Sequence, residues 1–259
     1  MITPKEEDIR IAQLYLSERL EAERSMTYNL EIVMREAANR MVSILYAANI
    51  NPQECDYINL PLRVQWDINA VVDWLNETIE DYFQILAIPD KENKDRILPL
   101  ILNRNYGMTF EERLSDYCRK YRNEILLLIG AGLYCSLKKE ALAKSIGENL
   151  KRPYHNSELV EGIAAPISYG RGRTNSMFTA IGALTKFGIG KGWMLDRHLK
   201  AEDKGAEWFM TFRNSTYPCE ICDDYASVLH PIEDPTPPLH LSCVCGTIYL
   251  DKNYQTIRL

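Results

Sequence analysis

The sequence predicts a mainly α-helical protein that ends in a small α+β module. Two observations carry this prediction. From Glu6 to Ala48 neither glycine nor proline occurs, and apolar residues recur at three-, four- and seven-residue steps, the spacing of one helix face. From Pro166 onward the composition changes, because six glycines fall between Gly170 and Gly192 and short alternating segments follow. The 259 residues are enough for one large domain or two modest ones.

The first predicted helix begins near Pro4 and ends before Asn51-Pro52. Thr3 can cap it, Pro4 suits the first turn, and acidic residues at 6–8 lie at the positive end of the helix dipole. The pattern fits one long helix, or two helices with a break near Ser25. A second helix is predicted from about Leu62 to Ile88, followed by a short one around 97–102.

Thr109 is the next predicted N-cap. Glu112 follows three residues later and completes a capping box. The helix that it opens runs into the apolar stretch 125–129, and Gly130 and Gly132 are expected to loosen its end.

Two shorter helices and two strands complete the prediction. Ser136 and Glu140 are predicted to form another capping box at the start of a helix over Leu137–Leu150. A further helix is predicted over Thr174–Phe187. Strands are predicted at Ala206–Phe212 and Cys245–Leu250.

These elements suggest three consecutive segments. Residues 1–105 form an N-terminal helical arm or domain, and residues 106–165 form a second helical part. Residues 166–259 contain the glycine-rich segment and the C-terminal module.

The charge of the chain is unevenly distributed. Its net charge of −6 and isoelectric point near 5.4 do not suggest a protein that binds nucleic acid in bulk. Residues 136–213 nevertheless carry a net charge of +5 between acidic flanks. This region fits a local contact with DNA and equally fits a solvated surface. The candidate nucleic-acid contacts are Arg171, Arg173, Lys186 and Lys191.

Cysteine usage and the apolar runs indicate the compartment. Seven cysteines, four of them clustered, argue for a reducing environment rather than a secreted disulfide framework. The N-terminal residues lack the pattern of a signal peptide. The longest apolar run, at 125–133, is shorter than the roughly 20 residues that span a bilayer. We therefore expect a soluble protein with no membrane partner and no small-molecule substrate.

Five residues near the C-terminus have the spacing of a metal site. Cys219-x-x-Cys222 and His240-x-x-Cys243 form two pairs of donors separated by a 17-residue loop, and Cys245 follows. Thiolate and imidazole suit tetrahedral zinc, and four protein donors leave no open coordination position. We therefore predict a structural zinc held by Cys219, Cys222, His240 and Cys243, with Cys245 able to replace Cys243.

Two other interpretations of the cluster stay open. One is a redox pair or disulfide, which leaves His240 and the second cysteine pair unexplained. The other is a chance enrichment of cysteine without metal. The acidic loop Asp223–Thr236 between the two pairs is expected to be exposed.

No complete catalytic motif is found, and we expect no enzyme activity. Pro218-Cys219-x-x-Cys222 matches half of the zinc-deaminase signature, but neither His155 nor His198 begins the His-x-Glu half. Hydrolase, phosphate-loop and dinucleotide motifs do not occur. A metal-dependent nuclease or toxin would need His230 or Asp223 beside the metal, and both are more simply loop residues.

Several segments occur in an order that carries a family resemblance. They are Gly107-Met108-Thr109-Phe110-Glu111-Glu112-Arg113, a helix reaching Ile129-Gly130-Ala131-Gly132, the helix Ser136–Leu150, Arg173-Thr174-Asn175, Gly188, Trp193 and the cysteine-rich tail. In this order, residues from about Met108 to Cys245 resemble the phage Mu protein F-like head morphogenesis family, the minor head proteins of tailed phages. The tail is the specific part, although Leu241 and Val244 replace its usual proline and arginine.

The resemblance implies a structural minor virion component that acts in head morphogenesis and DNA packaging. It would be associated with portal and/or capsid proteins and assembled in the host cytoplasm. The basic stretch 171–200 could face packaged DNA, and it equally fits a solvated surface. The fold class implied is mainly α with a small C-terminal α+β zinc-knuckle module. The alternatives are a zinc-knuckle nucleic-acid-binding protein and a metal-dependent nuclease or toxin.

Overall fold

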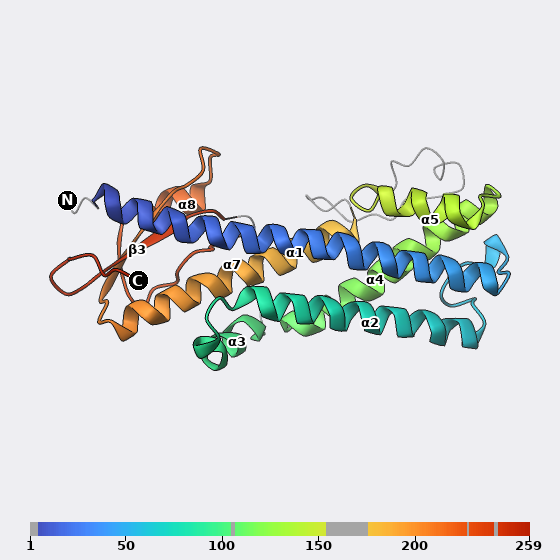
Figure 1. Cartoon of the computed structure of the whole chain (residues 1–259), viewed down its shortest axis with the longest axis horizontal. Helices are drawn as coiled ribbons and strands as arrows, with labels where there is room; N and C mark the ends of the chain where they lie inside the picture. Colours follow the sequence, from blue (N-terminus) through green and yellow to red (C-terminus); the bar gives the residue numbers. More distant parts are fainter. Residues whose placement is uncertain (1–4, 105–106, 154–175, 227, 241–242) are drawn as a thin grey trace. The chain divides into compact units, whose positions relative to one another are not determined.

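The computed structural model describes residues 5–104, 107–153, 176–226, 228–240 and 243–259 (Figure 1). The chain divides into two compact units. Unit 1 contains Met1–Met26, Phe83–Asn103 and Ala183–Leu259, and unit 2 contains Thr27–Tyr82 and Arg104–Gly182. Unit 1 thus joins the beginning and the end of the chain.

The described residues are mainly helical, with a small antiparallel sheet near the C-terminus, as predicted. The α-helices are α1 (Glu6–Ala47), α2 (Leu62–Ala87), α3 (Lys94–Leu102), α4 (Phe110–Tyr134), α5 (Lys139–Glu148), α7 (Met177–Asp203) and α8 (Glu220–Tyr225). The strands are β1 (Trp208–Phe212), β2 (Leu229–Pro231) and β3 (Gly246–Leu250). None of the helices described is long and apolar enough to cross a membrane.

Unit 2 is built around an apolar core of helices. Its buried residues include Leu30, Met34, Met41 and Leu45 of α1, Ile68, Leu75 and Ile79 of α2, and Leu114, Ile125 and Leu128 of α4. The helix α1 is continuous, so the alternative of a break near Ser25 is excluded. The hydroxyl of Tyr121 on α4 donates a hydrogen bond of 2.7 Å to the carbonyl of Met34 on α1, which satisfies a buried polar group in this core.

The capping box at the start of α4 is confirmed, but the one predicted for the next helix is wrong. Glu112 N donates to Thr109 Oγ1 at 3.1 Å, and Thr109 N donates to the Glu112 carboxylate at 2.9 Å. Ser136 instead ends α4, because its φ of 57° is left-handed and Leu137 N donates back to Gly132 O at 2.9 Å. The following helix, α5, starts later, at Lys139, without a side-chain cap.

The glycines of α4 and α7 permit close packing and do not end these helices. A Cβ atom on Gly132 would lie 2.4 Å from Leu142 Cδ1, so α4 continues past it and packs closely on α5. The predicted helix Thr174–Phe187 is too short, because α7 continues to Asp203. A Cβ atom on Gly192 of α7 would lie 2.0 Å from the carbonyl oxygen of Ala87. Close contact within unit 1 therefore outweighs the low helix propensity of glycine.

Unit 1 contains the three-stranded sheet, with the order β2-β1-β3 and antiparallel pairing throughout. The predicted strands around 206–212 and 245–250 are confirmed as β1 and β3, with Met210 opposite Ile248. The segment Asp223–Thr236 was expected to be an exposed loop, and most of its described residues are indeed exposed or half-buried, but it is not all loop. This segment contains the end of α8 and all of β2, and it buries His230 and Ile232.

Each face of the sheet is covered by a helix of unit 1. Phe209 and Tyr249 pack with Ala201 of α7 on one face. Met210 and Ile248 pack with Ala12 of α1 on the other face. The period-two alternation of β1 and β3 produces this division. The pairing of β3 with β1 determines where the segment before β3 lies, and this segment carries Cys243 and Cys245.

Candidate metal centre

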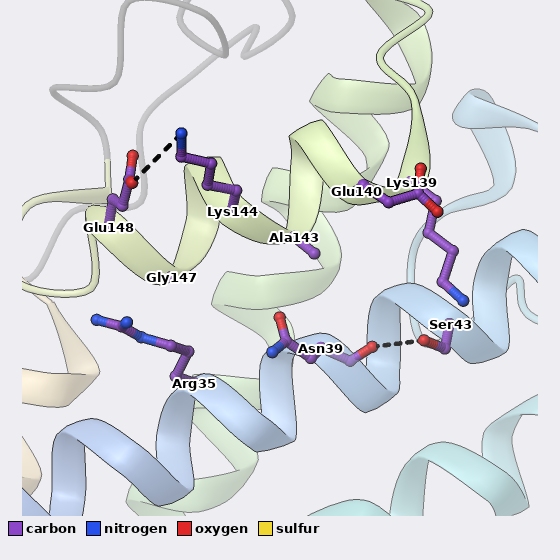
Figure 2. A pocket seen from close by; sticks show the side chains of 9 residues that line it. All are labelled: Arg35, Asn39, Ser43, Lys139, Glu140, Ala143, Lys144, Gly147 and Glu148. Carbon is purple, nitrogen blue, oxygen red and sulfur yellow. Dashed lines mark hydrogen bonds and ion pairs between the residues drawn. The ribbon is translucent and has the colours of Figure 1, made fainter.

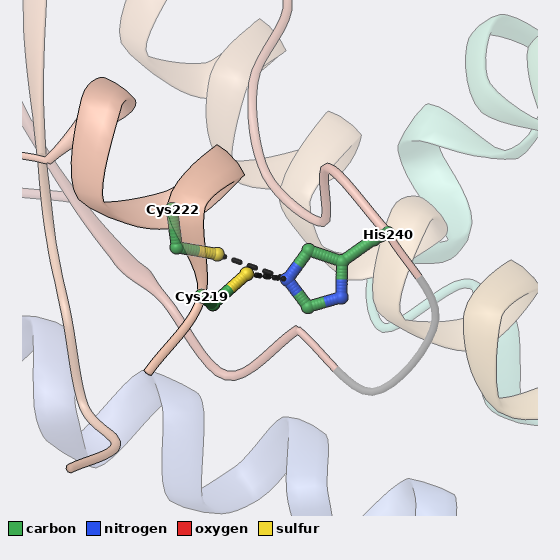
Figure 3. Close-up of side chains that lie close together, drawn as sticks. All are labelled: Cys219, Cys222 and His240. Atoms are coloured by element: carbon green, nitrogen blue, oxygen red, sulfur yellow. Dashed lines mark hydrogen bonds between the residues drawn. The ribbon is translucent and has the colours of Figure 1, made fainter. Parts of the chain in front are cut away.

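The first pair of predicted donors lies at the start of α8. Cys219 is the N-cap residue and Cys222 lies in the first turn, so the three-residue spacing brings both thiols to one side of the helix. Asp223 fixes this turn: its carboxylate accepts a hydrogen bond from Cys219 N at 3.3 Å and pairs with Arg213. Figure 3 shows both sulfur atoms directed at the ring of His240.

The second set of donors precedes β3. Cys243 N donates a hydrogen bond of 3.2 Å to His240 O. Cys245 lies immediately before Gly246, the first residue of β3. The segment that leads to α8 follows β1, and the segment that carries Cys243 and Cys245 leads into β3. Because β3 pairs with β1, these two segments are brought near each other.

Three distances among the donors are close to those around one tetrahedral ion. His240 Nε2 lies 3.2 Å from Cys219 Sγ and 3.0 Å from Cys222 Sγ, and the sulfurs of Cys222 and Cys243 are 3.8 Å apart. Neighbouring donors around one zinc lie about 3.5 to 3.8 Å apart, given bond lengths near 2.1 Å to nitrogen and 2.3 Å to sulfur. These three separations are therefore close to those that a bound zinc requires, whereas Cys243 does not lie within 4.8 Å of both Cys219 and His240.

The structure places the predicted ligands in two overlapping groups of three, and Cys245 belongs to one of them. Two groups have ligand atoms within 4.8 Å of one another: Cys219, Cys222 and His240, and Cys222, Cys243 and Cys245. Cys222 belongs to both groups, and so it is the donor that links the two pairs.

Burial and hydrogen bonding make the thiols unequal. The hydrogen bond with Cys245 lowers the pKa of Cys243 to about 5, and the same bond raises the pKa of Cys245 far above its ordinary range. Burial raises the pKa of Cys222 to about 12. Because these thiols lie next to one another, the loss of a proton from one opposes the loss of a proton from the next. A bound cation would remove this opposition. All seven cysteines are free thiols in the structure.

His230 and Asp223, the candidates for a catalytic role, have structural partners. The ring of His230 stacks on Tyr225 with centroids 3.9 Å apart, and His230 Nε2 lies 3.0 Å from the carbonyl of Tyr225. Hydrogen bonding to Arg213 lowers the pKa of Asp223, which keeps its carboxylate charged as a helix-capping group. Neither residue belongs to the two donor groups.

The predicted nucleic-acid contacts do not form a described site. Arg171 and Arg173 lie outside the described residues. Burial raises the pKa of Glu23, and the nearby charges of Arg19 and Lys186 oppose this rise. Burial lowers the pKa of Lys191. Other cations of α7 form ion pairs within unit 1. Lys200, for example, pairs with Asp90 at 2.8 Å.

A groove of about 410 Å³ lies in unit 2, between α1 and α5 (Figure 2). Its lining residues are Arg35, Asn39, Ser43, Lys139, Glu140, Ala143, Lys144, Gly147 and Glu148. Several of its charged groups pair with neighbours, as Lys144 does with Glu148 at 3.9 Å and Arg35 with Glu31 at 3.0 Å. Since these groups are exposed and paired, the groove presents no convergent set of catalytic or metal-binding groups.

The sequence prediction missed one residue of the centre. Arg19 of α1 is fully buried, and its Nη2 donates a hydrogen bond of 2.8 Å to the carbonyl of Cys243. Its position in a charged stretch of a long helix gave no sign of this contact.

In comparisons with models of known families, with curated proteins and with solved structures, nothing matches this chain. The interpretation of the centre therefore depends on its residues and geometry.

Proposed function

We propose that the cluster is a structural zinc centre whose ligands are Cys219, Cys222, His240 and Cys243. The observation that carries this proposal is the convergence of His240 Nε2 on two thiols, together with the 3.8 Å separation of Cys222 and Cys243. Cys245 is the alternative to Cys243 as the fourth ligand. Four protein donors would close the coordination sphere, so the ion would have no position for a reacting water.

Such a zinc would hold together a module that has few other sources of stability. The sheet of unit 1 has strands of three to five residues. A zinc that joins α8 to the entry of β3 would connect the two ends of the segment that contains β2. Metal binding of this kind contributes directly to folding free energy.

We further propose that the protein is a structural minor head protein of a tailed phage or prophage. It would act in head morphogenesis near the portal and the capsid interior, and it would have no enzymatic activity. The support is the order of segments from Met108 to Cys245, including the Cys-x-x-Cys and His-x-x-Cys-x-Cys tail. A closed metal centre agrees with a structural role better than with catalysis.

The surface of unit 2 supports a protein partner. Ile58, Leu62 and Trp66 follow one another at four-residue intervals near the start of α2, and their exposures are 82%, 68% and 69%. Exposed apolar groups of this size are typical of surfaces that contact other proteins. In the proposed function this surface would contact the portal or the capsid.

A particle experiment tests the proposed function. The gene would be deleted in the phage or prophage that encodes it, and DNA-filled heads would be counted by electron microscopy. We expect fewer filled heads after deletion, and we expect mass spectrometry to detect the protein in purified wild-type particles. Normal numbers of filled heads, from particles that never contain the protein, would overturn the proposal.

The alternative of a zinc-knuckle nucleic-acid-binding protein predicts a different result. Purified protein would then bind DNA with an affinity that falls steeply as salt increases, and neutralising Arg171 and Arg173 would weaken it. The internal pairing of Lys200 and the half-burial of Lys191 make this alternative the weaker one.

A further inference from the structure

Arg19 is distant from the metal centre in sequence and adjacent to it in unit 1. It precedes Cys243 by 224 residues, yet its Nη2 lies 2.8 Å from the carbonyl oxygen of that residue. Its side chain is 1% exposed, and its Nε lies 3.3 Å from the carboxylate of Glu23. Its Nη1 has no hydrogen-bond partner among the described residues.

A buried guanidinium requires compensating charge. Removing a cation from water costs several kcal/mol unless opposite charges and hydrogen bonds replace the solvent. Glu23 supplies one negative charge, but Lys186 also lies close enough to influence Glu23. Two cations and one carboxylate leave an excess positive charge at this place.

The proposed metal centre would supply the missing charge. A zinc ion with three thiolates and one neutral imidazole has a net charge of about −1. That charge would balance the excess from Arg19, Glu23 and Lys186.

The helix α7 closes around the same contact. A Cβ atom on Gly190 would lie 3.4 Å from Glu23 Oε1, 3.5 Å from Pro238 Cγ and 4.0 Å from Arg19 Cδ. These are ordinary contact distances, so Glu23, Arg19 and Pro238 all lie next to Gly190, and Pro238 is two residues before His240. Three segments of unit 1 therefore meet at Arg19.

We propose that Arg19 is a positioning residue of the metal centre. It holds the Cys243 backbone, balances the charge of the metal-bound thiolates, and so couples metal binding to the packing of the N-terminal part of α1 in unit 1. The coupling is reciprocal: metal stabilises this part of α1, and this part of α1 strengthens metal binding. This inference rests on the proposed zinc centre.

The test uses the full chain and Zn²⁺ alone. Zinc affinity would be measured by competition with a chromophoric chelator for wild type, Arg19→Met, Arg19→Lys and Arg24→Met. Arg24 is the matched control, since it lies on the same helix within unit 1 and its side chain is 74% exposed. Hydrogen exchange of residues 6–26 would be measured with and without zinc.

We expect Arg19→Met to weaken zinc binding by about 10- to 100-fold, the usual effect of losing an outer partner of a metal ligand. Arg19→Lys should recover part of this loss because it keeps the charge. Arg24→Met should bind zinc as wild type does. Zinc should slow exchange in residues 6–26 of wild type and Arg24→Met, but not of Arg19→Met.

The outcomes separate this inference from the metal proposal. If wild type binds no zinc, the metal centre is wrong and the role of Arg19 is rejected with it. If wild type binds zinc but Arg19→Met has the same affinity, only the role of Arg19 is rejected. If Arg19→Met does not fold, wild type and Arg19→Lys decide: absence of zinc-dependent protection at residues 6–26 in wild type rejects the coupling.

Discussion

Unit 1 and unit 2 differ in how their buried polar groups are satisfied. In unit 2 the hydroxyl of Tyr121 bonds to Met34 O, and the carboxylate of Glu124 accepts a hydrogen bond from Met177 N at 3.1 Å. In unit 1 several buried atoms lack a hydrogen-bond partner among the described residues: Arg19 Nη1, Arg197 Nε, His198 Nδ1, Thr211 Oγ1, Thr247 Oγ1 and the hydroxyl of Tyr249. Among the described residues of unit 2, Asn76 Oδ1 alone shares this condition.

This difference indicates different sources of stability. Long amphipathic helices let unit 2 bury a continuous apolar core, which can drive folding without a cofactor. Unit 1 combines a small sheet with costly buried polar groups. The proposed zinc, whose binding in small structural sites is worth about 10–16 kcal/mol, would offset those costs.

The largest expected effect comes from Cys222→Ser. Because Cys222 belongs to both donor groups, its loss should remove zinc more completely than the loss of Cys243 or Cys245. We expect unit 1 to lose protection from hydrogen exchange while the helices of unit 2 keep theirs. Metal analysis of the purified protein and residue-resolved exchange would measure both effects.

Cys135→Ser is the matched control for this prediction. Cys135 is a partly buried cysteine that follows α4 in unit 2, so the same substitution there should leave zinc and both units intact. Should Cys222→Ser remove zinc and yet leave unit 1 fully protected, the two units would not differ in their dependence on metal.

Local sequence patterns were sufficient for much of the fold and for the donors. The spacing of Cys219 and Cys222 predicts a pair of donors directed at one ion, and the first turn of α8 brings both thiols to one side. Thr109 and Glu112 form the predicted capping box because both partners lie within three residues. These features depend on neighbours in sequence, and so the sequence contains all the necessary information.

The missed features depend on neighbours in space. Arg19 resembles any other charged residue of a long helix until the segment containing Cys243 packs against it. Gly192 indicates a break by its propensity, but the carbonyl of Ala87 occupies the place of its side chain and the helix continues. The three-residue strand β2 has too few residues to show alternation, so it was interpreted as part of a loop.

An intermediate effect is expected from Glu124, the buried carboxyl of unit 2. Burial raises the pKa of Glu124 from 4.5 to about 8. The folded state therefore holds a proton that the unfolded state releases, and stability should fall as pH rises from about 4.5 to 8. We expect Glu124→Gln to remove this decline, which is on the order of a few kcal/mol. Urea denaturation of both proteins at pH 5 and pH 8 would measure it.

The comparison of units gives this prediction a control. Zinc content should be the same in wild type and Glu124→Gln at each pH, because Glu124 belongs to unit 2 and the donors belong to unit 1. A pH dependence that persists unchanged in Glu124→Gln would show that another group is responsible.

The smallest expected effect is the loss of the cap of α4. Thr109→Ala removes the oxygen that accepts a hydrogen bond from Glu112 N. The loss of such a cap lowers the free energy of unfolding by about 1 kcal/mol. Thr109→Ser keeps this oxygen, so it should retain most of the stability in urea denaturation. Equal losses in both variants would assign the effect to the methyl group and not to the cap. Because the cap stabilises a helix of unit 2, zinc affinity should not change in either variant. A loss of zinc binding that parallels the loss of stability would show that the two units fold as one.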